Sequence, residues 1–162
     1  MPSRGPLQKR LDYSFKKPEL LELALTHPSV NHEQSKTLSN NQRLEFLGDA
    51  VLQMIISAEL YRKFPTRNEG TLSKARARMV NRDALAEQAV QIKLGKELVL
   101  SRGEERNGGR ERSSALADAF EALLGAIFLD GGFVKVKKFI LKQFSERFEG
   151  VDADRHVGNP KG

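Results

Sequence analysis

The chain has 162 residues, a net charge of +6 and no cysteine, and this length suits one domain with a substantial core. No run of apolar residues is long enough to span a membrane, and the lack of cysteine excludes disulfides and thiolate metal sites. Residues 1–10 include basic side chains but no apolar run follows them, so they do not form a secretory signal and we expect a cytoplasmic protein.

Apolar residues recur at helical spacing along most of the chain, and proline and glycine separate the segments. A first helix is predicted from Pro18 to Leu25, because proline is favoured in the first helical turn. Residues 30–40 are polar and are predicted to form a loop. A long helix is then expected from Asn41 to about Phe64, and Pro65 ends it.

The second half of the chain continues the helical pattern. Asn68 and Asn81 are predicted to be the N-caps of two further helices, since their side-chain oxygens can accept hydrogen bonds from free backbone N–H groups. Residues 101–110 are charged and rich in glycine, so we expect a mobile loop there. A buried helix is predicted over 115–129 and an amphipathic helix over 136–148. Because no alternating strand pattern occurs, the sequence predicts an all-α fold.

Four carboxylates lie in helices that are otherwise apolar. Glu45 and Asp49 are four residues apart, and Asp118 and Glu121 are three apart, so each pair projects from one face of its helix. Carboxylates at this spacing repel each other, and a carboxylate in an apolar setting is unfavourable without a partner. Pairing with basic side chains is one solution, but no basic residue lies within 115–129. The oxygen ligands instead favour a hard cation, Mg²⁺ or Mn²⁺, bound where the two helices pack together.

Small residues on both acid-bearing helices would let these helices approach closely. They are Gly48, Ala50, Ala117 and Ala122. A divalent cation held between the helices can activate water and stabilise the leaving oxygen of a phosphate ester. The pattern therefore favours phosphoryl chemistry.

Basic residues concentrate between Arg62 and Arg82, where seven of them accompany a single acid, Glu69. Such a stretch fits a polyphosphate partner, although a solvated helix face explains it about as well. Glu69 follows the predicted N-cap Asn68, where a carboxylate interacts favourably with the helix dipole, so capping and a functional role are both open. The pair Gly108–Gly109 lacks the pattern of a phosphate-binding loop, and no nucleotide cofactor is expected.

The segment Arg43–Leu52, RLEFLGDAVL, closely resembles the signature of the ribonuclease III family, whose members cut double-stranded RNA. Four further segments agree with that family in order and spacing: Leu25–Ser29, Glu69–Ser73, Gly103–Arg110 and Leu116–Gly131. The resemblance implies an all-helical endonuclease domain in residues 1–150 that acts as a homodimer. It also implies that residues 151–162 form a linker toward a double-stranded-RNA-binding domain.

The resemblance assigns roles to particular residues. In that family the carboxylates matching Glu45, Asp49, Asp118 and Glu121 bind Mg²⁺, and those matching Asp49 and Glu121 are the most directly catalytic. Water attacks the phosphodiester and leaves a 5′-phosphate and a 3′-hydroxyl, in the processing of ribosomal and messenger RNA precursors. The residue matching Phe46 packs across the dimer interface, although a buried core phenylalanine would explain this position equally well.

One position departs from the family pattern, because the family usually has glutamate where this chain has Gln42. Candidate RNA-binding or auxiliary residues are Gln42, Glu69, Lys74, Arg76 and Arg78. Gln42 and the shortness of the chain motivate an alternative, a non-catalytic subunit that binds double-stranded RNA. A further alternative is an all-helical nucleotide pyrophosphatase, since those enzymes also use helix-borne acids and Mg²⁺.

Overall fold

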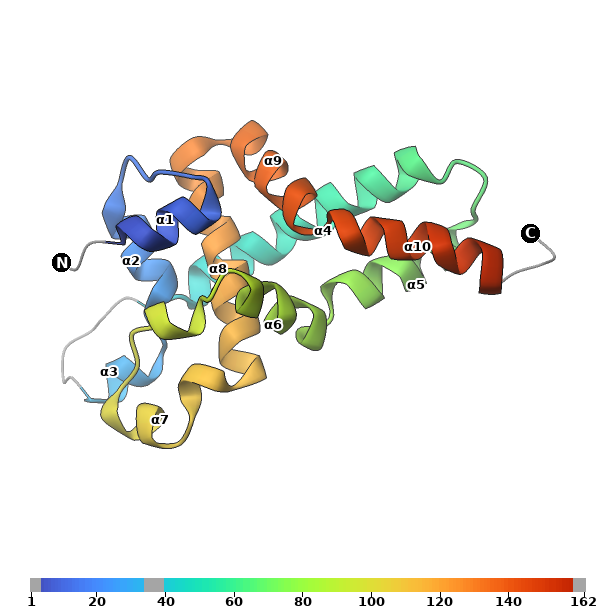
Figure 1. The fold of residues 1–162 in the computed structure, drawn as a ribbon. Helices are drawn as coiled ribbons and strands as arrows, with labels where there is room; N and C mark the ends of the chain where they lie inside the picture. Colours follow the sequence, from blue (N-terminus) through green and yellow to red (C-terminus); the bar gives the residue numbers. More distant parts are fainter. Residues whose placement is uncertain (1–3, 34–39, 159–162) are drawn as a thin grey trace.

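The computed structural model describes residues 4–33 and 40–158, and its helices (Figure 1) pack around a main hydrophobic core and a second, smaller apolar cluster of Ala24, Leu44, Ala122 and Ala126. In chain order the elements are α1 (Gly5–Leu11), α2 (Pro18–Leu25), α3 (Ser29–Glu33), α4 (Gln42–Lys63), α5 (Glu69–Val80), α6 (Arg82–Gln91), the short 3-10 helix η1 (Gly95–Glu97), α7 (Arg102–Arg106), the 3-10 helix η2 (Gly109–Glu111), α8 (Ser113–Gly131), α9 (Phe133–Gln143) and α10 (Ser145–Gly158). Within the described ranges the only sheet-like pairing is an isolated bridge between Thr26 and Val99. The prediction of an all-α fold is confirmed.

Helix α8 forms the centre of the molecule, and α2, α4, α6 and α9 pack around it (Figure 1). From Ala115 to Ile127 every residue except Asp118 is buried. Such a helix is apolar on all sides because it has neighbours on all sides. None of the helices in the described part of the chain is both long enough and apolar enough to cross a membrane.

The helices α4 and α8 cross in backbone-to-backbone contact at two glycines. A Cβ atom built on Gly48 would lie 1.7 Å from the carbonyl oxygen of Glu121, and one built on Gly125 would lie 2.4 Å from the carbonyl oxygen of Leu44. No larger residue fits at either position without a shift of the backbone. Of the other small residues that the sequence suggested for this contact, Ala117 and Ala122 are buried and Ala50 is exposed.

The predicted helix boundaries hold for the middle of the chain. Helix α4 ends at Lys63, just before Pro65. The side-chain oxygen of Asn68 accepts a hydrogen bond from the Thr71 N–H at 2.9 Å, and that of Asn81 accepts one from the Ala84 N–H at 2.8 Å. Both asparagines therefore cap the helices as expected.

Two segments predicted to be loops contain helices. Helix α3 occupies the first part of the predicted loop 30–40, of which residues 34–39 lie outside the described ranges. In the segment 101–110, the Ser101 hydroxyl accepts a hydrogen bond from the Glu104 N–H at 3.1 Å and caps α7. Arg110 then donates to the carbonyl oxygens of Gly95 and Leu98 at 3.0 and 2.8 Å, so long-range contacts hold a segment that composition alone suggested was mobile.

The C-terminal part also differs from the expectation. The predicted single helix over 136–148 is two helices, because the chain leaves α9 at Phe144 and begins α10 at Ser145. Helix α10 then runs through the expected domain boundary at residue 150, and Val151 packs in the core. Residues 159–162 lie outside the described ranges. That this end of the chain leads to a further domain stays a prediction.

Candidate active site

The structure brings the four predicted carboxylates together beside the glycine crossing. One carboxylate oxygen from each of Glu45, Asp118 and Glu121 lies within 4.8 Å of the other two, in an arrangement that could hold a metal ion. Asp49 stands at the edge of this group and shares a hydrogen bond with Glu121. Two pairs that are about 70 residues apart in sequence thus form one cluster, because the contact at Gly48 sets α4 directly against α8.

Three of the four carboxylates, those of Glu45, Asp49 and Glu121, line a surface hollow of about 480 Å³. Glu121 is only 9% exposed, Glu45 and Asp118 are half-buried, and Asp49 is exposed. The hollow is lined by Gln42, Glu45, Phe46, Asp49, Ala50 and Glu121. An acidic group that is buried at one side and open at the other can bind a cation and still admit a substrate.

The carboxylates of the cluster raise one another's pKa values. The pKa of Glu121 is raised to about 9, first by burial and then by its hydrogen bond to Asp49 and the charges of the other three carboxylates. The pKa of Glu45 is raised to about 7 by burial, by the charge of Asp118 and a hydrogen bond with it, and by the charge of Asp49. Among residues 4–33 and 40–158, the charges named as acting on these two groups are all negative, so the donor set fits a divalent cation.

His27 lies near Asp118, a proximity that the sequence did not suggest. Its Nδ1 accepts a hydrogen bond from the Ser29 N–H at 3.0 Å, which leaves Nε2 as the protonated nitrogen of the neutral ring. Burial lowers the pKa of His27 and the nearby Arg112 lowers it too, whereas the charge of Asp118 raises it.

A backbone hydrogen bond connects the turn before α3 to the start of α4, since the Asn41 N–H donates to the Thr26 carbonyl at 2.9 Å.

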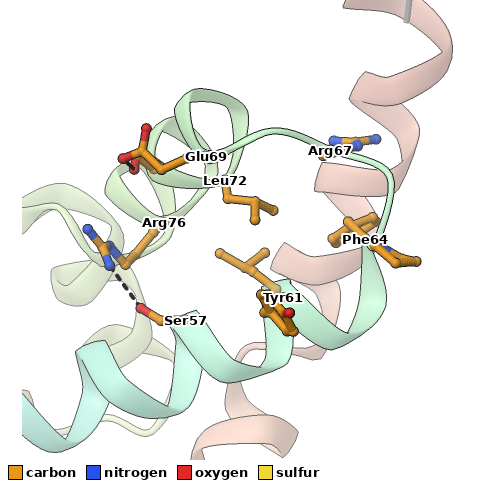
Figure 2. Close-up of a pocket in the computed structure, with 10 residues that line it drawn as sticks. Ser57, Tyr61, Phe64, Arg67, Glu69, Leu72 and Arg76 are labelled. Carbon is orange, nitrogen blue, oxygen red and sulfur yellow. Dashed lines mark hydrogen bonds between the residues drawn. The ribbon is translucent and has the colours of Figure 1, made fainter.

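The predicted RNA-binding residues fall in two places. Gln42 is exposed and lines the acidic hollow, whereas the others belong to α5. Lys74 and Arg78 are exposed there. Arg76 is half-buried and donates to the Ser57 hydroxyl at 2.9 Å, and Glu69 accepts a hydrogen bond from the Ser73 hydroxyl at 3.0 Å (Figure 2).

Glu69 and Arg76 line a second pocket, of about 530 Å³, between the C-terminal half of α4 and the start of α5 (Figure 2). The nearest α4 residue of this pocket, Ser57, is seven positions beyond Ala50 in the acidic hollow, or about 10 Å along the helix axis. Within one chain, therefore, the structure does not bring Glu69 or Arg76 to the carboxylate cluster.

Comparison with known proteins settles the family. A model described as ribonuclease-III-like matches residues 17–148. The chain belongs to the ribonuclease-III-like family. A Ribonuclease 3 from Oleidesulfovibrio alaskensis is 50% identical over 150 residues, covering 92% of this chain and 66% of the relative, and one from Desulforamulus reducens is 53% identical, covering 92% and 61%.

The fold agrees with this assignment. The solved nuclease domain of ribonuclease III from Campylobacter jejuni superposes with a TM-score of 0.84 at 43% identity, and the match covers 91% of this chain and 99% of that one. The chain thus spans a whole nuclease domain of that kind but less than two thirds of the length of the curated ribonucleases. The ribonuclease-III-like region contains all four carboxylates, Phe46 and α5.

Helix α4 also carries an apolar stripe on its outer side, which the sequence patterns above did not indicate. Phe46 is 80% exposed, Met54 54% and Tyr61 77%, and Ala50 and Ala58 are exposed between them. The interpretation of Phe46 as a core residue is therefore wrong. The spacing of these residues was visible in the sequence as a second helical stripe, separate from the one that faces the core.

Proposed function

We propose that the chain is the endonuclease part of a ribonuclease III, which hydrolyses phosphodiester bonds of double-stranded RNA with Mg²⁺ and leaves 5′-phosphate and 3′-hydroxyl ends. Mn²⁺ is expected to replace Mg²⁺. The observation that supports this most directly is the set of converging carboxylates that raise one another's pKa values and line an open hollow in a ribonuclease-III-like fold. By analogy with the family, the substrates are precursors of ribosomal and messenger RNA.

The four carboxylates would have different roles according to how deeply each is buried. Glu45, Asp118 and Glu121 have oxygens close enough to hold one cation together, and the glycine crossing fixes the two helices that carry them. When bound, the cation supplies an activated water and stabilises the negative charge that develops on the leaving oxygen. Asp49 is the exposed member, so it lies on the side from which substrate enters, where it can orient the attacking water.

Binding of the RNA is proposed to depend on phosphate contacts. Lys74 and Arg78 are exposed on α5, which follows the hollow-bearing helix α4. Duplex RNA offers its phosphates and 2′-hydroxyls rather than its base edges, so we expect little base specificity and a strong dependence on salt. Arg76 is expected to position α5 through Ser57 rather than to contact RNA.

We propose that two copies of the chain associate through the α4 stripe. The Campylobacter jejuni nuclease domain has a region involved in dimer formation, and here the exposed apolar residues follow one side of α4. A stripe of this kind is a normal binding surface for a partner. Phe46 projects at one end of the stripe, and the pocket of Ser57, Tyr61 and Phe64 is a hollow at the other end (Figure 2).

A twofold axis would make these two ends complementary. Phe46 and Tyr61 are separated by 15 positions, about 22 Å along α4, and Ser57 and Phe64 lie on nearly the same side of the helix as Phe46. A twofold axis near Met54 therefore places the Phe46 side chain of each copy over the pocket of the other, as an isologous interface requires. The apolar lining of that pocket includes Leu60, Tyr61, Phe64, Pro65 and Leu72.

Replacing Phe46 by serine is expected to weaken this dimer by roughly 10²–10³-fold, because a buried aromatic anchor contributes about 2 kcal/mol and each dimer contains it twice. Light scattering after size exclusion, over a range of protein concentrations, measures the effect. Val90→Ser is the matched control. Val90 is likewise an exposed apolar residue, with an exposed fraction of 63%, but it lies on α6. A Phe46→Ser protein that remains dimeric at the same concentrations as the wild type would contradict the proposed dimer interface.

The nuclease assignment is tested by incubating the chain with a long RNA duplex and Mg²⁺. We expect short duplex products whose strands carry 5′-phosphates, detected by labelling before and after phosphatase treatment. Asp49→Asn should stop cleavage while leaving the fold intact, because Asp49 is exposed. Asp83→Asn, an equally exposed acid on α6, is the control and should cleave normally. Retained cleavage in Asp49→Asn would exclude its catalytic role.

A second function, a non-catalytic subunit that binds double-stranded RNA, is favoured by Gln42. This residue lines the acidic hollow and is neutral where the family usually has glutamate. The same experiment separates the two functions. Duplex binding without cleavage in Mg²⁺ or Mn²⁺ would support the non-catalytic subunit.

A further inference from the structure

Helix α9 carries a concentration of positive charge that neither the acidic hollow nor the α4 stripe uses. Between Asp130 and Glu146 the sequence has four lysines and no acid. All four, Lys135, Lys137, Lys138 and Lys142, are exposed. This segment lies outside the basic stretch 62–82, so it is a separate source of positive potential on the molecule.

Three of these lysines form a line along one edge of the helix. Lys135, Lys138 and Lys142 fall within about 60° of arc and span about 10 Å along the axis. The opposite side of α9 is occupied, because Val136 and Ile140 are fully buried in the core. The apolar face of the helix is therefore already packed, and the lysines form the part that is left to solvent.

The connection between α1 and α2 runs beside this edge and extends it. At one end, a carboxylate oxygen of Asp12 lies 3.9 Å from the Lys142 Nζ. At the other, the backbone N–H groups of Lys16 and Lys17 donate to the Asp130 carboxylate at 3.0 and 2.8 Å. Both Lys16 and Lys17 are exposed. We define the lysine face as Lys16, Lys17, Lys135, Lys138 and Lys142.

Acids near the lysine face offset only part of its charge. Asp130 accepts a hydrogen bond from the Tyr13 hydroxyl at 2.5 Å as well as the two backbone bonds, and its negative charge acts on Lys16. Counting Asp12 and Asp130 against the five lysines leaves the face a formal net charge of +3. In the described part of the chain, the pair of Lys142 with Asp12 is the one ion pair on this face, and both side chains are largely exposed, where such pairs contribute little. Elsewhere arginines such as Arg4 and Arg10 are paired with buried or half-buried glutamates.

The distance from the carboxylate cluster indicates what the face could bind. Gly131, the last residue of α8, lies ten positions after Glu121, or about 15 Å along the helix axis, and α9 begins two residues later. A polyanion that occupies the hollow and extends along the molecule would carry further phosphates at this distance. An anionic membrane is a poorer fit, because the apolar side of α9 is packed in the core and a surface-bound amphipathic helix must bury that side in lipid.

We propose that the lysine face binds the phosphate backbone of RNA beyond the segment that is cut. The inference rests on the proposed function, in which duplex RNA is the substrate. Lysine ammonium groups on a single helix edge contact phosphates as point charges, so the face adds affinity and fixes the direction of the RNA without selecting a sequence. Its contribution should depend on duplex length, since only an RNA that extends past the hollow reaches it.

The double reversal Lys135→Glu/Lys138→Glu tests the face in a Glu121→Gln background, which slows cleavage by roughly 10³-fold. Fluorescence anisotropy with a duplex of about 40 base pairs should show at least tenfold weaker binding and a salt dependence of log K shallower by about two, one for each lost phosphate contact. A short duplex, an RNA hairpin with a stem of about four base pairs, spans roughly 14 Å, so it does not reach the face when it is centred on the hollow and should bind both proteins nearly equally. Lys93→Glu/Lys96→Glu, which changes the same charge at exposed positions around η1, is the matched control.

The possible results separate this inference from the proposed function. Equal losses for both double reversals would mean a general charge effect and would overturn the lysine face. Unchanged RNA binding together with lost binding to vesicles of anionic lipid would identify a membrane contact and overturn it as well. If the Glu121→Gln protein with its lysines intact binds neither duplex, the proposed function fails too. A melting curve close to that of the parent confirms that the reversals act on the surface alone.

Discussion

Replacing Glu121 by glutamine is expected to lower Mg²⁺-dependent RNA cleavage by roughly 10³-fold, since a cation ligand that stabilises transition-state charge is worth several kcal/mol. The same change should stabilise the metal-free protein. Glu121 is 9% exposed and faces three other carboxylates, so its ionised form is unfavourable until a cation is bound. Glutamine keeps the shape of the side chain and removes the charge.

The stabilisation should depend on pH with a definite sign. Because the pKa of Glu121 is raised from 4.5 to about 9 in the folded chain, the folded state binds a proton more tightly than the unfolded state. The stability of the metal-free wild type therefore falls as pH rises from about 4.5 toward 9, and Glu121→Gln removes much of this fall. At pH 8 we expect a gain of about 2–3 kcal/mol, or roughly 5–10 °C in melting temperature.

Differential scanning fluorimetry in EDTA and in Mg²⁺, from pH 5 to pH 9, measures both effects. Mg²⁺ should raise the melting temperature of the wild type at high pH, because it binds only the folded state, and should raise that of Glu121→Gln much less. Glu59→Gln is the control, since Glu59 is also buried but is paired with Arg62 and should lose stability. If Glu121→Gln is less stable than the wild type at pH 8 in EDTA, the cluster is not the repulsive site described above.

The sequence predicted the carboxylate cluster because the spacing of the acids within each helix determines which side of the helix they lie on. Acids at i and i+4 or i+3 in an apolar helix must share a face, and that face must point toward the interior where the apolar residues go. The relation between the two pairs was less determined. It depends on Gly125 meeting Gly48, and helix periodicity does not show which glycine of a buried helix faces which neighbour.

The errors have a common physical origin in long-range contacts. Residues 101–110 were expected to be mobile because the segment is rich in glycine and charged residues. In the structure Arg110 holds this segment in place by donating hydrogen bonds to the carbonyl oxygens of Gly95 and Leu98. The segment from residue 151 was expected to be a linker because it has no apolar period, yet α10 runs to Gly158 and Val151 packs in the core. For Phe46 only the alternative of a core residue was wrong, since the side chain is 80% exposed in the single chain; its place at a dimer interface, which the resemblance implied, stays a prediction.

Gly48→Ala is expected to destabilise the protein by about 3 kcal/mol or more, lowering its melting temperature by roughly 10 °C. Helix propensity alone predicts the opposite, because alanine in the middle of a helix is about 1 kcal/mol more favourable than glycine. The added methyl would lie 1.7 Å from the Glu121 carbonyl oxygen, which is backbone and cannot rotate away. The helices must separate, and the separation also moves Glu45 away from Glu121.

Gly103→Ala is the matched control, since Gly103 is helical and a Cβ atom there meets nothing within 4 Å. It should be neutral or slightly stabilising by chemical denaturation. Because propensity and close approach predict opposite signs at Gly48, a Gly48→Ala protein as stable as the wild type would show that α4 and α8 do not touch there. It would also remove the reason for the convergence of the four carboxylates, because the two pairs meet only where the two backbones do.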